Sequence, residues 1–219
     1  LLSVWLSTLV CNAAYNVLVT GVGGFVGFHT SLKLKSMGHN VVGIDNMNLY
    51  YTPALKRARV QLLSESSIPF HVIDVCDGLA VTRLIEDNKI NRIIHLAAQA
   101  GVRYSIKFPF EYTHNNVDCF VTLLEVLKGR NIPLVYASSS SVYGRNTKIP
   151  FSEQDEVNNP ASLYASTKRS NELLARTYLN LYNQSSIGLR FFTVYGPWGR
   201  PDMAYFSFVS GTYLYNAQF

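Results

Sequence analysis

The sequence predicts an α/β fold, in which a doubly wound parallel sheet carries helices on both of its faces. Strand-like apolar runs alternate with helix-like stretches from Asn16 onward, which is the pattern of a parallel sheet. A glycine-rich turn at residues 20–27 follows the first run and opens the first helical stretch. No internal repeat, low-complexity segment or linker between two complete domains interrupts this order.

The first half of the chain begins with a short apolar run that the glycine turn ends. The helix after the turn is expected to stop at Gly38, since glycine readily closes a helix. The third strand is expected at residues 70–75, where an apolar run suits burial on both sheet faces. The elements expected here are, in order, a strand at 16–20, a helix at 24–37, a strand at 41–45, a helix at 53–63 and a strand at 70–75.

The second half continues the same alternation. Asp77 is placed to cap a helix with its side chain, Gly129 to end a long helix and Pro160 to begin the last one. The elements expected after the Asp77 helix are a strand at 92–97, a helix at 110–128, a strand at 133–137, a helix at 160–182 and a strand at 187–192.

Composition and charge limit the kinds of protein that this chain can be. At 219 residues and 48% hydrophobic content it can bury a full core, which excludes a disordered or fibrous protein. The net charge of +5 would suit an anionic ligand. Lysine and arginine are nevertheless scattered, the densest run being residues 56–59, so we expect no nucleic-acid partner.

Cysteine usage and the first residues bear on location. Cys11, Cys76 and Cys119 are widely spaced and odd in number, so we expect no disulfide framework and no metal site. A reducing, cytoplasmic location fits this pattern. Residues 1–15 form an apolar leader that is too short to cross a bilayer. A signal remnant, the end of a membrane anchor and a leader strand stay open as explanations of it.

The glycine turn has the spacing of a dinucleotide-binding fingerprint. Gly21, Gly24 and Gly27 follow a G-x-x-G-x-x-G pattern between a strand and a helix. Without side chains the backbone can approach a pyrophosphate, which lies on the N–H groups at the positive end of the helix. Asp45 ends the second strand, where it can accept hydrogen bonds from the adenosine ribose and would repel a 2′-phosphate. These features predict a Rossmann-type domain that binds NAD in preference to NADP.

Further cofactor contacts are expected from residues that follow neighbouring strands. Asp74 and Val75 would flank the adenine, although a cap for the following helix explains them nearly as well. The full set of expected cofactor contacts is Gly21, Gly24, Phe25, Val26, Gly27, Asp45, Asn46, Asp74, Val75, Leu96, Ala97, Ala98, Tyr164 and Lys168.

Two segments carry the side chains expected to do chemistry. Tyr164 and Lys168 stand four residues apart on one helix face. A nearby lysine charge stabilises phenolate and lowers a tyrosine pKa, as a general base requires. The serine run at 138–141 begins at the end of the fifth strand, the edge where open parallel sheets bind ligands. A hydroxyl there can hydrogen-bond the substrate oxygen that the tyrosine deprotonates.

The order and spacing of these motifs resemble those of a known family. The glycine turn, His-Leu-Ala-Ala-Gln-Ala at 95–100, the serine run and the Tyr164–Lys168 pair resemble the extended short-chain dehydrogenases/reductases, which are NAD-dependent nucleotide-sugar epimerases and dehydratases. The resemblance covers residues 16–208. It implies that Tyr164 is the catalytic base, that Lys168 activates it and binds the nicotinamide ribose, and that Ser139 is the hydroxyl partner.

Two stretches, 98–105 and 190–204, resemble the members of this family that act on UDP-glucuronate. The serine run lacks Asp and Glu, which disfavours dehydration, and Thr193 stands where UDP-galactose 4-epimerases typically carry Asn. The resemblance implies epimerisation at C4 of a UDP-sugar, UDP-glucuronate to UDP-galacturonate, through a 4-keto intermediate. A UDP-galactose 4-epimerase and a catalytically impaired NAD-binding fragment are the alternatives. The expected substrate contacts are Arg103, Ser139, Ser140, Ser141, Thr193 and Arg200.

The resemblance also implies domain limits and partners. Residues 16–200 would form the NAD-binding domain with the catalytic residues, and residues 201–219 the start of a substrate-binding region that is mostly missing. The helices at 110–128 and 160–182 would form a four-helix homodimer interface. The expected partners are therefore a UDP-sugar and a second copy of the chain, with a membrane anchor at the leader as the less favoured alternative to a cytoplasmic protein.

Overall fold

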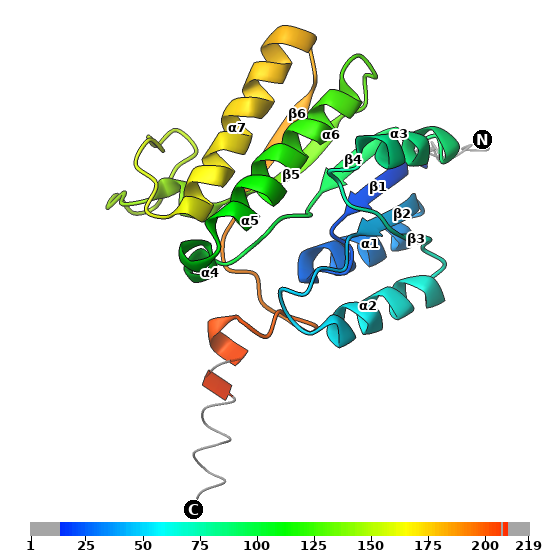
Figure 1. Ribbon diagram of the computed structural model, residues 1–219, viewed down its shortest axis with the longest axis horizontal. Coiled ribbons are helices and arrows are strands. Elements are labelled where there is room, and N and C mark those ends of the chain that lie inside the picture. Colours follow the sequence, from blue (N-terminus) through cyan, green and yellow to red (C-terminus); the bar gives the residue numbers. More distant parts are fainter. Residues whose placement is uncertain (1–13, 207, 210–219) are drawn as a thin grey trace, which may run out of the picture.

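Six parallel strands form the centre of the molecule in the order β3-β2-β1-β4-β5-β6 (Figure 1). The computed structural model describes residues 14–206, 208 and 209. The strand order reverses between β1 and β4, so the sheet is doubly wound and the predicted α/β fold is confirmed. The strands are β1 Asn16–Thr20, β2 Asn40–Asp45, β3 Phe70–Val72, β4 Arg92–His95, β5 Leu134–Ser139 and β6 Ser186–Phe191.

Helices cover both faces of this sheet (Figure 1). Alternate residues of β1 point to opposite faces, so Val17 and Val19 join the core under α1 and α2, whereas Leu18 joins the core under α3, α6 and α7. The helical elements are α1 Phe25–Ser36, α2 Pro53–Glu65, α3 Gly78–Asp87, α4 Val102–Lys107, α5 Pro109–Thr113, the π-helical turn η1 His114–Asp118, α6 Cys119–Leu127, the 3-10 turn η2 Ser140–Tyr143 and α7 Leu163–Tyr182.

Two helix starts are set by side chains that accept a backbone hydrogen bond. Asp77 Oδ1 accepts from Ala80 N at 3.0 Å, which confirms the predicted cap of α3. Ser162 Oγ accepts from Ala165 N at 3.1 Å, so α7 begins at Leu163 rather than at Pro160. The capping hydroxyl therefore decides where this helix starts.

β3 is shorter and more exposed than the sequence predicts. It ends at Val72, lies at the edge of the sheet beside β2, and leaves Val72 67% exposed. The prediction of a strand buried on both faces through Val75 is therefore wrong. An apolar run cannot reveal which strand lies at an edge, because strand order is decided by tertiary packing. Residues 73–77 instead leave the sheet as a loop that leads to α3.

The long helix predicted at 110–128 is interrupted by the π-helical turn η1. Asn116 lies in this turn with its side chain buried, and that side chain bonds to residues far away in the sequence. π-Helical turns often occur where a helix serves a functional site.

Cys76 and Cys119 form a disulfide, with their Cα atoms 4.3 Å apart. The expectation of no disulfide is therefore wrong. The two cysteines are 43 residues apart in the sequence, so no local spacing indicates the pair. They meet because the loop after β3 and the start of α6 pack on the same face of the sheet.

The apolar leader predicted at residues 1–15 lies outside the described residues up to residue 13. From Tyr15 onward the chain joins the sheet, since Asn40 N donates to Tyr15 O at 2.9 Å. Among the helices of the described part, none is long and apolar enough to cross a membrane.

Candidate active site

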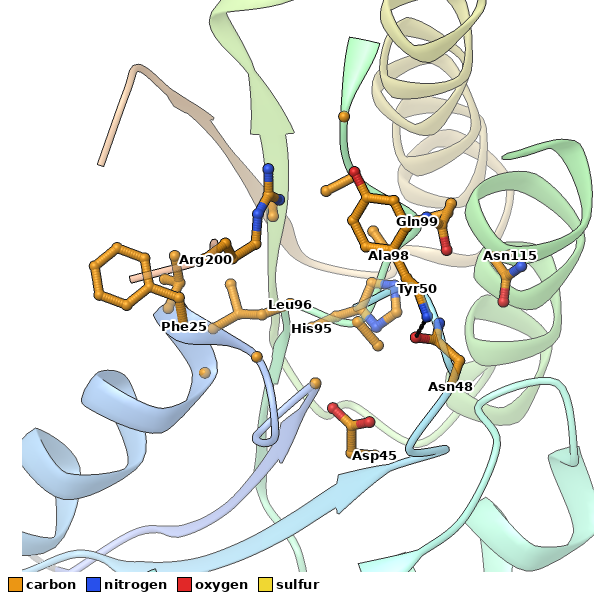
Figure 2. A pocket seen from close by; sticks show the side chains of 18 of the residues that line it. Phe25, Asp45, Asn48, Tyr50, His95, Leu96, Ala98, Gln99, Asn115 and Arg200 are labelled. Atoms are coloured by element: carbon orange, nitrogen blue, oxygen red, sulfur yellow. Dashed lines mark hydrogen bonds between the residues drawn. The ribbon is translucent and has the colours of Figure 1, made fainter. Parts of the chain in front are cut away.

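A cavity of about 350 Å³ opens at the carboxyl edge of the sheet, around the point where the strand order reverses. Open α/β sheets bind ligands at this place. Figure 2 shows Phe25, Asp45, Tyr50 and Arg200 around the same space, although they come from four separate segments. Every residue that the sequence predicts as a cofactor contact lines this cavity.

The glycine turn forms one wall, and its shape requires glycine. Gly21 has φ of +75°, and a Cβ there would lie 2.7 Å from Ala97 N. A Cβ on Gly27 would overlap Gly21 O, and one on Gly24 would lie 3.0 Å from it. Gly24 caps α1 without a side-chain hydrogen bond, and the first turn of α1 holds no acidic residue. The N-terminus of α1 is thus free to bind an anion.

Asp45 is held at the end of β2 by its neighbours. Its carboxylate accepts from Gly23 N at 3.1 Å and from Met47 N at 2.8 Å, and Lys56 Nζ lies 3.6 Å from Oδ1. Burial lowers the pKa of Lys56, an effect that the nearby Asp45 charge opposes. Asp45 remains a lining residue of the cavity, so its carboxylate can still accept hydrogen bonds from a ligand.

Arg59 is a residue that supports the glycine turn and that the sequence analysis missed. Its side chain is completely buried, and it donates to Gly23 O at 2.7 Å, Tyr51 Oη at 2.6 Å and Trp198 O at 2.6 Å. The basic run at 56–59 is therefore partly internal. Lys56, Arg59 and Leu63 are the buried residues of α2, and this i, i+3, i+7 spacing is the signal that could have revealed it.

Ser139, Tyr164 and Lys168 line the cavity where β5 ends and α7 begins. Tyr164 lies in the first turn of α7, and Lys168, one turn later, donates to Ala137 O at 2.9 Å near the end of β5. Burial lowers the pKa of Lys168 to about 8. Burial also raises the pKa of Tyr164, whereas a hydrogen bond with Ser139 and the Arg200 charge act against this rise.

The expected effect of Lys168 on Tyr164 is therefore not what this structure gives. The net shift of the Tyr164 pKa is upward, and its largest cause is the loss of solvation. Lys168 Nζ instead donates to the carbonyl of Ala137. Because Lys168 also lines the cavity, its ammonium can donate another hydrogen bond to a ligand there.

A buried histidine supports residues 96–99, which line the cavity and are called the strap below. Thr20 Oγ1 accepts from Leu96 N at 3.1 Å and Ala97 N at 3.0 Å, so its own hydrogen is free to bond to His95 Nδ1 at 2.9 Å. Burial lowers the pKa of His95 to about 3, and the imidazole is therefore neutral. Its role is to hold the strap, since a neutral and enclosed ring gains no proton near pH 7.

Asn116 is a second residue that the sequence analysis missed. Its Oδ1 accepts from Gln99 N at 2.7 Å, and its Nδ2 donates to Gln99 O at 3.0 Å and Thr167 Oγ1 at 3.1 Å. Asn171 Nδ2 donates to Asn116 O at 2.6 Å. These bonds tie the strap to α7 beside Lys168. The only sequence signal is an Asn inside a helical stretch, where that residue is a poor helix former.

The predicted substrate contacts separate into two groups. Ser139, Thr193 and Arg200 line the cavity, whereas Arg103, Ser140 and Ser141 do not. Arg103 lies exposed on α4, and Ser141 instead bonds to Ser139, with Ser141 N donating to Ser139 Oγ at 3.1 Å.

The Arg200 guanidinium is paired with the Asp202 carboxylate in this structure. It makes two hydrogen bonds of 3.1 Å to the Asp202 carboxylate, which also accepts from Tyr50 Oη at 2.9 Å. Burial and Asp202 both raise the pKa of Tyr50. An anionic ligand of Arg200 would have to compete with Asp202 for the guanidinium.

Comparison with known proteins gives consistent matches to one family. The NAD dependent epimerase/dehydratase family model matches residues 17–212. UDP-glucuronate 4-epimerase 3 of Arabidopsis thaliana is 55% identical over 89% of this chain and 46% of its own length. The structure of UDP-glucuronic acid 4-epimerase from Bacillus cereus, solved with UDP-glucuronic acid and NAD, matches with a TM-score of 0.83 at 35% identity, over 90% of this chain and 62% of that chain.

A neutral-sugar enzyme matches less closely. The structure of UDP-glucose 4-epimerase from Brucella ovis with NAD has a TM-score of 0.72 and 30% identity, over 82% of this chain and 52% of that chain. The chain thus spans between 46% and 62% of the length of these three relatives.

Proposed function

This chain belongs to the NAD dependent epimerase/dehydratase family, and from that membership we propose that the whole protein interconverts UDP-glucuronate and UDP-galacturonate with NAD as its cofactor. The observation that carries the proposal is that Ser139, Tyr164 and Lys168 face the same cavity as the glycine turn. A cofactor on the turn and a sugar beside Tyr164 would therefore share one space. The names of the UDP-glucuronate relatives support the choice of sugar.

The residues present fit NAD. The pyrophosphate would lie on the N-terminus of α1, where an added side chain at Gly21 or Gly27 would collide with backbone and one at Gly24 would lie 3.0 Å from Gly21 O. Asp45 would accept from the adenosine ribose, and its charge favours NAD over NADP. NAD supplies a hydride acceptor that can return the hydride to the other face of the sugar, so it is regenerated in each cycle.

The chain's own residues would then move the proton. Tyr164 Oη takes the proton from the 4′-hydroxyl of the sugar while the 4-keto intermediate forms, and returns it afterwards. The Ser139 hydroxyl bonds to the same substrate oxygen. Lys168 donates to the nicotinamide ribose, a role that its place in the cavity supports, and its activation of Tyr164 stays a prediction.

Thr193 is the hydroxyl that we assign to the sugar carboxylate, because it lines the cavity, and a further hydroxyl of the serine run stays the predicted second donor. Arg200 is assigned to anionic substrate oxygens, which would replace Asp202. Arg103, Ser140 and Ser141 stay predictions as substrate contacts, since they stand outside the cavity.

The test is substrate choice by the full-length protein. Each UDP-sugar is incubated with the enzyme, and the C4 epimers are resolved by chromatography or proton NMR. Hydrogen-bond donors that pair with the sugar carboxylate lose their partner when that group is CH₂OH. Each unpaired buried donor costs about 1–3 kcal/mol. Two such donors predict a roughly 30-fold or greater preference in kcat/KM for UDP-glucuronate. Thr193→Val should reduce this preference. Equal turnover of UDP-glucose would favour a UDP-galactose 4-epimerase, and NAD binding without turnover would favour an impaired NAD-binding protein.

We also propose a homodimer built from the helices at 109–127 and α7. These helices lie side by side (Figure 1), and Phe110, Leu173 and Leu181 are more than half exposed on them.

Residues 16–200 are proposed as the cofactor-binding unit, followed by the start of a substrate-binding region. The cytoplasmic location stays a prediction, and the Cys76–Cys119 disulfide weakens the cysteine argument on which it was based.

A further inference from the structure

The disulfide includes Cys76, which follows the edge strand β3, whereas Tyr164 lies on α7, which packs on β5 beyond the point where the strand order reverses. Cys119 is the first residue of α6 and lines the cavity together with Asp74 and Val75, which we expect beside the adenine. Cys76 lies in the loop that carries those two residues. We propose that Cys76 and Cys119 form a reversible thiol–disulfide switch that sets the affinity of the cavity for NAD, an inference that rests on the proposed NAD cofactor.

Asp74 connects the two sulfurs to the cofactor site. Its Oδ1 accepts from Cys76 N at 2.8 Å and lies 3.8 Å from Cys119 Sγ. Its Oδ2 accepts from Asn46 Nδ2 at 2.9 Å, in the loop after β2. The Asp74 carboxylate thus joins three segments that border the adenine end. Any movement of Cys76 relative to Cys119 is transmitted to this carboxylate.

Reduction must move the sulfurs. Once the bond is broken the two atoms separate to van der Waals distance, although their Cα atoms are only 4.3 Å apart. Cys119 is 3% exposed, lines the cavity and has its sulfur 3.8 Å from Asp74, so its freed thiol can move into the cavity or against Asp74. Either movement, or a shift of the Cys76 loop, disturbs the adenine end. The disulfide form is preorganised for the cofactor and should bind it more tightly.

The chemistry needs only an external disulfide of the class RSSR as the oxidant. The more exposed Cys76 attacks RSSR as a thiolate, which forms a mixed disulfide and releases one thiolate RS⁻. Cys119 thiolate then attacks the Cys76 sulfur and releases the second RS⁻. Two cysteine thiols are oxidised, RSSR is reduced to two RSH, and the two cysteine protons end on the leaving groups. A ring nitrogen of His114 lies within 4.8 Å of both sulfurs and can relay these protons.

The same three residues invite comparison with a zinc site. Cys76, Cys119 and His114 form a group of three possible ligands in the described part of the chain, whereas structural zinc sites normally use four protein ligands. The sulfurs are also bonded to each other, and a disulfide is not a thiolate ligand. The geometry therefore favours the disulfide, and zinc becomes an outcome of the test.

The experiment measures NAD binding by the full chain in glutathione buffers of increasing oxidised fraction. Equilibrium dialysis gives the Kd for NAD, and mass spectrometry of a tryptic digest detects the cross-link between the peptides 60–83 and 108–128. We expect the cross-link in oxidising buffer and at least fivefold weaker NAD binding in reducing buffer. By linkage, saturating NAD should favour the disulfide in the redox equilibrium by the same factor.

Three single variants serve as controls. Cys76→Ser and Cys119→Ser should each bind NAD as the reduced protein does and no longer respond to the buffer. Cys11→Ser should respond as the wild type does. The comparison of oxidised with reduced wild type requires no variant to fold.

The outcomes separate the two proposals. Absence of the cross-link in oxidising buffer, or Kd values within twofold of each other in the two states, overturns the switch and leaves the proposed function standing. Stoichiometric zinc that protects the thiols from oxidation also overturns it. No NAD binding in either state overturns both the switch and the proposed cofactor.

Discussion

Arg59→Met removes the guanidinium that joins the glycine turn to the loop after β6. Two of its hydrogen bonds are short and go to backbone carbonyls, Gly23 O at 2.7 Å and Trp198 O at 2.6 Å. A bond from a charged donor contributes about 1.5–3 kcal/mol, and a buried carbonyl left unpaired costs a similar amount. The native Arg59 Nε has no hydrogen-bond partner among the described residues, which favours the lower half of that range. We expect a loss of about 3–4 kcal/mol in the free energy of unfolding.

The loss is measured by urea unfolding followed by circular dichroism, with the slope m as a check that the denatured state is unchanged. For a protein of this size, about 2–4 °C of Tm is lost per kcal/mol, so Tm should fall by about 10 °C. Arg57→Met is the matched control, because Arg57 is exposed on the same helix. A loss below about 1 kcal/mol in Arg59→Met, or an equal loss in Arg57→Met, would refute the reasoning.

Two further predictions concern the proposed chemistry. Tyr164→Phe keeps the ring that packs edge-on against Tyr112 at 6.1 Å but removes the proton acceptor, so kcat should fall by about 10²- to 10⁴-fold while NAD stays bound; near-normal turnover would exclude Tyr164 as the base. Burial lowers the pKa of Lys168 to about 8, so its charge is present below that pH and is lost above it, and kcat should decline on the alkaline side. In Lys168→Arg the guanidinium stays charged, and the decline should move to higher pH; an unchanged profile would assign it to another group.

The sequence predicts best those features that local chemistry decides. The glycine spacing at 21, 24 and 27 is visible because the backbone permits no side chain there, and Asp77 reveals a cap because the donor, Ala80 N, is only three residues away. The edge position of β3 is not visible, since a short apolar run is equally suited to the centre of a sheet. Strand order is decided by which helices cover which face, and that information is distributed over the whole chain.

The residues missed in the site share one property, which is that their partners are distant in sequence. Arg59 bonds to Gly23 and Trp198, and Asn116 bonds to Gln99 and Asn171. A basic residue inside a basic run and an amide inside a helix both resemble ordinary surface positions. Only the helical spacing of Lys56, Arg59 and Leu63 hinted that one face of α2 is internal. The Cys76–Cys119 pair was also missed because its two members are distant in sequence.

The two ends of the cavity are held by η1 and α6, which are successive turns of one helical segment. Their hydrogen bonds predict whether a movement at one end reaches the other. Asn116 fixes the strap and α7 near Lys168 through short, buried hydrogen bonds, whereas Cys119, three residues later, borders the adenine end. Since Asn116 has bonds on both its backbone and its side chain, a shift of the Cys119 sulfur should stop there. Reduction of the disulfide should therefore weaken NAD binding but leave kcat at saturating NAD within about twofold, whereas Tyr164→Phe should do the reverse. A fall in kcat on reduction that parallels the change in Kd would mean that the helical segment transmits the movement, and that Asn116 does not isolate the catalytic end.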